Sequence, residues 1–122
     1  MHPARRQALF PARFTAQAEG QAGVREAGAA LYAQCLQRID GQLAGQRFVL
    51  GGEGPSACDH QLMVYAHWCA LDARSLDALP HFAQWLDRML RVPAVQAALR
   101  AVASPLAARI TAAVRVSTPS FT

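Results

Sequence analysis

The sequence predicts an all-α fold, a bundle of about five helices in a single domain that spans residues 1–122. Three observations predict it. Alanine, the best helix former, supplies 26 of the 122 residues. Apolar residues make up 52% of the chain, which is enough for a modest core at this length. They recur at three- and four-residue steps, as on one face of a helix, and no stretch alternates as a strand does.

The first two predicted helices differ in how clearly they are marked. Residues 1–20 mix arginine, alanine and aromatic residues and predict a loosely ordered helix that Pro11 kinks or ends. Residues 22–44 predict a longer amphipathic helix packed on a core, with Gly45 suited to its end. Its apolar stripe consists of Val24, Ala27, Leu31, Cys35, Ile39 and Leu43, widened by Tyr32 and Leu36.

A capping box marks the start of the third helix. Ser56 and Asp59 have the spacing Ser-x-x-Asp directly before an apolar run, so each side chain is expected to bind the backbone N–H of the other residue. The helix that follows, residues 57–71, is apolar nearly all round, which predicts a place at the centre of the bundle. The preceding apolar run, residues 48–50, is too short for a strand.

Prolines mark the starts of the remaining helices. Pro80 and Pro93 each precede an apolar periodicity, and proline is favoured in the first turn of a helix. Trp85 is expected to anchor the core from the helix that begins at Pro80. Pro105 predicts a last helix that continues to Val114, and residues 116–122 are expected to be loosely ordered.

Charge and cysteine content narrow the possible partners. The net charge is +4, but the 12 basic residues, all arginine, are scattered, which argues against a nucleic-acid partner.

No apolar run is long enough to span a membrane, and no secretory leader is visible. Three cysteines without CxxC spacing predict small buried side chains in a reducing compartment, so we expect a cytoplasmic protein.

A metal site is not expected. His60 and His67 lie about two helical turns apart, too far to share one ion, and no third ligand has suitable spacing. His67 is expected instead to pack or to form a hydrogen bond within the bundle.

Three segments, in order, resemble one family. They are Arg47–Gly52 followed by Pro55–Asp59, then Pro80–Met89, then Arg91–Leu99. They are similar to three elements of the helical C-terminal half of glutathione S-transferases: the loop and Ser/Thr-x-Ala-Asp box before the central helix, the "P-x-l-x-x-W-x-x-r" helix, and the "rPaVqaal" run. One departure is Cys58, which stands where the family usually has a small residue.

The resemblance implies a function that is incomplete in this chain. In the family, the helical half supplies a wall of the electrophile site and part of the dimer surface. A thioredoxin-like half binds glutathione and carries the catalytic residue. That half is expected to be missing here, so no catalytic residue is carried over and the chain alone is expected to be inactive. Glutathione is the expected co-substrate if a thioredoxin-like domain is supplied, and the expected partner is that domain or a second copy.

The resemblance also suggests three individual binding residues. His2 stands near the start of the first helix, where a histidine reaches glutathione in some relatives; the alternative is an unstructured terminus. Phe10 and Phe14 stand on the segment that helps to line the family's electrophile pocket; the alternative is core packing.

Two other functions remain open. One is a non-catalytic protein–protein interaction module of the same fold, and the other is a carrier of small apolar ligands in the groove of the bundle.

Overall fold

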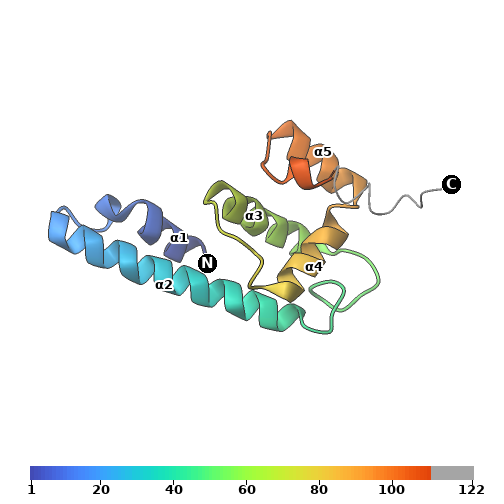
Figure 1. Cartoon of the computed structure of the whole chain (residues 1–122), viewed down its shortest axis with the longest axis horizontal. Helices are drawn as coiled ribbons and strands as arrows, with labels where there is room; N and C mark the ends of the chain where they lie inside the picture. Colours follow the sequence, from blue (N-terminus) through green and yellow to red (C-terminus); the bar gives the residue numbers. More distant parts are fainter. Residues whose placement is uncertain (111–122) are drawn as a thin grey trace. The chain divides into compact units, whose positions relative to one another are not determined.

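The computed structural model describes residues 1–110, and within this range the chain is helical with no strand (Figure 1). The described elements are α1 (His2–Leu9), the 3-10 turn η1 (Pro11–Arg13), α2 (Ala18–Leu43), α3 (Ala57–Leu71), α4 (Pro80–Met89) and α5 (Pro93–Ala101). The all-α class is therefore confirmed for the described residues. None of their helices is both long and apolar enough to cross a membrane.

The chain divides into two compact units, Met1–Gly41 and Gln42–Thr122. The first unit contains α1, η1 and nearly all of α2. As predicted, α1 ends before Pro11. A Cβ atom placed on Gly28 would lie only 2.6 Å from the backbone nitrogen of Ala8. The missing side chain of Gly28 therefore lets α1 approach α2 closely.

The predicted stripe of α2 is buried on one side only. Tyr32 and Leu36, which widen the stripe, and Leu43 within it are buried, with exposed fractions of 1%, 4% and 3%. On the other side of the stripe, Leu31 is 44% exposed and Ala27 is also exposed. Gly28 lies one turn before Tyr32, on the buried side.

The second unit is organised around α4. Four of its side chains are completely buried, which confirms the prediction that Trp85 is a core residue: Phe82, Trp85, Leu86 and Met89. The rings of Phe82 and Trp85 stack with centroids 5.5 Å apart.

The bounds of α3 agree with the prediction, but its burial does not. Leu62, Met63, Ala66 and Cys69 are buried on one face, whereas Val64 and Leu71 on the other side are 39% and 54% exposed. The expected central position is therefore wrong for the described residues. A helix with apolar residues on every side is fully buried only if other elements pack against all of its sides. Among the described residues, other elements cover one side of α3.

Two helices end in the same way. Ala73 after α3 and Ala103 after α5 have φ angles of 53° and 50°, in the left-handed region. In each case the next residue donates its N–H back to the third-last residue of the helix, Arg74 to the Cys69 carbonyl at 2.8 Å and Ser104 to the Leu99 carbonyl at 2.9 Å. These are Schellman motifs in which alanine occupies the position usually held by glycine.

The last described segment is helical from Ala107 to Ile110, following Pro105, and its apolar side chains Leu106 and Ile110 are buried. The predicted continuation to Val114 and the expected loose order of residues 116–122 lie outside the described residues.

The three cysteines differ in exposure. Cys69 is buried and Cys35 is half-buried, but Cys58 is exposed. The prediction of a buried thiol is wrong for Cys58, because this residue lies in the first turn of α3 on the side opposite the core.

Candidate functional site

The residues suggested for glutathione and electrophile binding all lie in the first unit. His2 is exposed in the first turn of α1, and one exposed imidazole is not sufficient to hold a tripeptide. Phe10 and Phe14 flank η1 and are 45% and 47% exposed, so the alternative role in the core is wrong. The Arg13 guanidinium lies 5.0 Å from the centroid of the Phe10 ring, a cation–π arrangement. Among the described residues, neither cavity reported below includes His2, Phe10 or Phe14.

Ser56 and Asp59 form the predicted capping box at the start of α3. The half supplied by Asp59 is the better formed, because its Oδ2 accepts the Ser56 N–H at 2.8 Å. The Ser56 hydroxyl donates to the same oxygen at 3.0 Å. Its bond with the first-turn N–H of Asp59 falls short of standard hydrogen-bond geometry. The box therefore depends mainly on the carboxylate.

The other oxygen of Asp59 has a role that the sequence did not reveal. Asp59 Oδ1 accepts the Val49 N–H at 2.9 Å and the indole N–H of Trp85 at 2.8 Å. The carboxylate is completely buried. One buried side chain thus joins the loop before α3, the start of α3 and the middle of α4. No spacing in the sequence signals this, because Trp85 is 26 residues away.

The hydrogen bonds determine the protonation state of Asp59. Burial alone raises the pKa of a carboxyl group, because it disfavours the charged form. The bonds from the Ser56 N–H, the Trp85 indole, the Val49 N–H and the Ser56 hydroxyl outweigh burial and lower the pKa below its ordinary value. Asp59 is therefore ionised at neutral pH, and its buried charge is balanced by donors rather than by a cation.

Two further side chains connect segments of the second unit. Arg88 on α4 donates from Nε to the Arg47 carbonyl at 2.9 Å and from a terminal nitrogen to the Gln46 carbonyl at 3.1 Å. Burial, together with the nearby Arg47, lowers the pKa of Arg88, which remains charged at neutral pH. Gln96 on α5 donates to the Leu90 carbonyl at the end of α4, at 2.8 Å.

One cavity is a groove between α3 and α5, which we call the α3–α5 groove, with a volume of about 380 Å³. Pockets for small molecules typically have about 300–1,000 Å³ and a mainly apolar lining with few polar groups. This groove fits both criteria, since the polar side chains among its described lining residues are two histidines of α3. Its lining residues are His60, Met63, Val64, His67, Ala94, Val95, Ala98, Leu99 and Val102.

His67 has a defined partner, as the sequence led us to expect. Its Nδ1 lies 2.7 Å from the hydroxyl oxygen of Ser104. Ser104 is buried and follows the Schellman motif of α5, and its hydroxyl also accepts the Leu106 N–H at 3.2 Å. The contact connects α3 to the turn after α5. It could not be predicted, because Ser104 is 37 residues away and has no recognisable motif.

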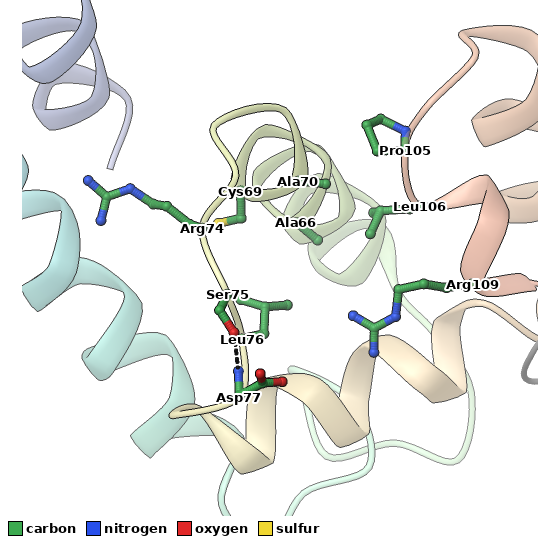
Figure 2. Close-up of a pocket in the computed structure, with 10 residues that line it drawn as sticks. All are labelled: Ala66, Cys69, Ala70, Arg74, Ser75, Leu76, Asp77, Pro105, Leu106 and Arg109. Carbon is green, nitrogen blue, oxygen red and sulfur yellow. Dashed lines mark hydrogen bonds between the residues drawn. The ribbon is translucent and has the colours of Figure 1, made fainter.

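A smaller cavity of about 220 Å³ lies beside the C-terminal end of α3 (Figure 2). Its charged lining residues are Arg74, Asp77 and Arg109, and Arg109 is paired with Asp87 at 3.3 Å. Figure 2 also shows the Asp77 N–H donating to the Ser75 hydroxyl at 3.1 Å. The cavity is below the usual volume range and carries both signs of charge. The α3–α5 groove is therefore the better candidate site.

Within residues 1–110, no three metal-ligating side chains lie close enough together to hold an ion. Comparison with models of known protein families, with curated proteins and with solved structures gives no match for this chain.

Proposed function

We propose that this chain is the helical domain of a glutathione-transferase-related protein. In this role it provides a wall of the electrophile site and a dimer surface, while a thioredoxin-like domain, on the same or another chain, binds and activates glutathione. One observation carries the proposal. Side chains that distinguish the motifs form hydrogen bonds from the second motif to the first, and from the third motif to the residue that follows the second.

Each motif contributes to these contacts. Asp59 of the first motif accepts from Trp85 of the second, and Arg88 of the second motif donates to the Arg47 carbonyl of the first. Gln96 of the third motif binds the carbonyl of Leu90, directly after the second. A chance likeness of three short segments would not require their distinguishing side chains to meet. The contacts therefore support the view that the motifs form one unit, as they would in a shared fold.

In the proposed reaction, this chain and the thioredoxin-like domain have different tasks. Conjugation forms a bond between the glutathione sulfur and the electrophilic carbon, and it displaces a leaving group or opens a ring. The thiol must first lose its proton, which requires a group that favours the thiolate. No residue of this chain is proposed for that task. Its contribution is to hold the electrophile, with Phe10 and Phe14 as the proposed aromatic surface.

The test joins the chain to an active thioredoxin-like domain. We expect the isolated chain to show no heat of binding with millimolar glutathione in calorimetry. A fusion that places a glutathione-binding thioredoxin-like domain before Met1 is expected to conjugate a chromogenic aromatic electrophile. Replacing Phe10 and Phe14 with alanine is expected to raise KM for the electrophile while leaving the KM for glutathione unchanged.

The matched control for the fusion is Leu50→Ala, which removes an exposed apolar side chain outside the proposed electrophile surface. Two results would contradict the proposal. Saturable glutathione binding by the isolated chain would mean that the thioredoxin-like domain is not needed for the thiol site. A folded but inactive fusion would remove the transferase role.

A specific observation also favours a second candidate, the protein–protein interaction module. Leu9, Phe10 and Phe14 lie close in sequence around η1, and each is more than 40% exposed. Exposed apolar groups of this kind are typical of association surfaces. If the chain is an interaction module, we expect it to form a stable complex with another protein or a second copy, and we expect the Phe10→Ala/Phe14→Ala variant to abolish that complex. The fusion with a thioredoxin-like domain would then show no conjugation activity.

A further inference from the structure

We propose that the α3–α5 groove binds a small aromatic carboxylate, whose rings occupy the apolar groove and whose carboxylate accepts a hydrogen bond from Nε2–H of His67. The site goes beyond the proposed function, because it requires neither glutathione nor a second domain and contains neither Phe10 nor Phe14. The proposal depends on the apolar lining of the groove, on the tautomer of His67 and on the lack of acidic side chains among the described lining residues.

The lining favours an apolar molecule. Met63, Val95 and Leu99 are buried, with exposed fractions of 7%, 5% and 6%, so they form a floor. Val64 and Val102 are 39% and 63% exposed and form the two rims, one on α3 and one on α5. Ala94 and Ala98 on α5 have side chains too short to fill the space between the floor and the rims.

The contact with Ser104 favours one tautomer of His67. The buried Ser104 hydroxyl accepts the Leu106 N–H, so that neighbour cannot take the hydroxyl proton. Among the described residues, the remaining partner of this hydroxyl is His67 Nδ1, at 2.7 Å. We infer that the hydroxyl donates to Nδ1, because a buried hydroxyl proton is otherwise left without an acceptor. A neutral imidazole that accepts at Nδ1 carries its proton on Nε2.

The other ring nitrogen is thereby available as a donor. Among the described residues, Nε2 of His67 forms no hydrogen bond, and His67 is one of the two polar side chains that line the groove. A ligand must therefore present an acceptor to it. An ionised oxygen is the strongest such acceptor, since charge-assisted bonds are about twice as strong as neutral ones. In the described part of the chain no aspartate or glutamate lines the groove to repel it.

The direct test uses 2-naphthoate as the probe and 2-methylnaphthalene as its uncharged counterpart. In the full-length chain with ¹⁵N-labelled histidine, NMR is expected to show His67 protonated on Nε2 before any ligand is added. Titration with 2-naphthoate is expected to shift the Nε2 resonance and to saturate. 2-Methylnaphthalene is expected to bind at least about tenfold more weakly, because it lacks the charged acceptor.

Three variants separate the parts of the site. His67→Leu removes the donor and keeps an apolar surface, so it is expected to abolish the preference for naphthoate while methylnaphthalene still binds. Ala98→Leu fills the groove and is expected to abolish binding of both compounds while His67 keeps its tautomer. Ala97→Leu adds the same side chain to an exposed position outside the groove and is expected to change neither affinity.

Several results would overturn the proposal. One is a free protein in which His67 carries its proton on Nδ1, since the donor would then face Ser104. Another is equal affinity for the two compounds. A third is an unresponsive His67 resonance, as expected if another part of the chain or a second copy covers the groove. Because no glutathione is present, these results are independent of the fusion experiment.

Discussion

At the scale of single residues, Asp59 stabilises the second unit through two different kinds of contact. Its Oδ2 belongs to the local cap with Ser56, which the Ser-x-x-Asp spacing predicted. Its Oδ1 binds Val49 and Trp85, which are 10 and 26 residues away. Local motifs can be read from a sequence because their geometry is fixed by one helical turn. The partners across the unit depend on packing, and no spacing reveals them.

Replacement of Asp59 by asparagine is expected to lower the free energy of unfolding by about 3 kcal/mol, because hydrogen bonds to a buried charge contribute about 1.5–3 kcal/mol each. Asparagine retains one acceptor oxygen, but its NH₂ group would face the Ser56 N–H, so two donors would meet. Urea unfolding followed by tryptophan fluorescence measures the loss. Asp87→Asn, on an exposed carboxylate, is the matched control and is expected to change stability by less than about 0.5 kcal/mol.

Asp59 also makes the free energy of unfolding depend on pH. The pKa of Asp59 is lowered in the folded protein, so its stabilising contribution is complete above the pKa of an unfolded aspartate, about 3.9. The contribution is lost as the pH falls through the lower, folded pKa. The difference in stability between wild type and Asp59→Asn is therefore expected to be constant from pH 7 to about pH 5 and to shrink below about pH 4. A difference that persists unchanged at pH 2 would show that the charge is not involved.

At the scale of helices, the sequence predicted where helices begin better than where they end. Pro80 and Pro93 are the first residues of α4 and α5, as predicted. The ends of α3 and α5 gave no signal, because the left-handed residues Ala73 and Ala103 are alanines in an alanine-rich chain. The partial burial of the α2 stripe has a similar cause, since the apolar residues span a wide stripe and their periodicity does not show which side of it is covered.

Glycine at either left-handed position is expected to stabilise the protein. Ala73→Gly and Ala103→Gly remove the close approach of Cβ to the backbone at positive φ, a gain of about 1 kcal/mol each. Ala97→Gly, at an exposed position within α5, is the control of opposite sign and is expected to destabilise by about 1 kcal/mol. Thermal unfolding followed by circular dichroism measures all three. A loss of stability on Ala73→Gly or Ala103→Gly would contradict the strain described here.

Gly28 and Gly23 form a matched pair within α2. Gly28→Ala is expected to destabilise the contact with α1 by about 1–3 kcal/mol, because the added methyl group would meet backbone atoms that cannot move aside locally. Gly23 has open space around it, so Gly23→Ala is expected to stabilise the helix by up to about 1 kcal/mol. Hydrogen exchange of the α1 amides distinguishes the two: protection should fall for Gly28→Ala only.

At the scale of the whole molecule, exposed apolar side chains are expected to drive association. Phe10 and Phe14 in the first unit and Val64 and Val102 in the second are all more than one-third exposed. We expect the chain to self-associate at high concentration in sedimentation experiments. The double variant Phe10→Ser/Phe14→Ser is expected to weaken this association, whereas Leu50→Ser, an exposed residue on a loop, is expected to have a small effect. A monodisperse monomer at high concentration would contradict the prediction.

The helical class was predictable at this scale because composition and periodicity act along the whole chain. The candidate groove was not, because it depends on which faces of α3 and α5 remain uncovered. A ligand-binding groove in the bundle was left open as a possibility, but the prediction that α3 is buried on all sides gave no place for it beside α3. The family resemblance remains a prediction, supported by the contacts between its motifs and testable by the fusion.

The buried indole of Trp85 has a practical consequence for optical measurements. It stacks on Phe82 and donates its N–H to the Asp59 carboxylate, so its excited state is shielded from water and its surroundings are ordered. The chain's other indole, Trp68, is only half-buried and lies 5.5 Å from the ring of Tyr65. A Trp68→Phe variant would leave one tryptophan, located where the loop, α3 and α4 meet, and excitation near the red edge of the indole band would avoid the two tyrosines. Its emission wavelength would then report the assembly of that junction in real time, without an attached dye.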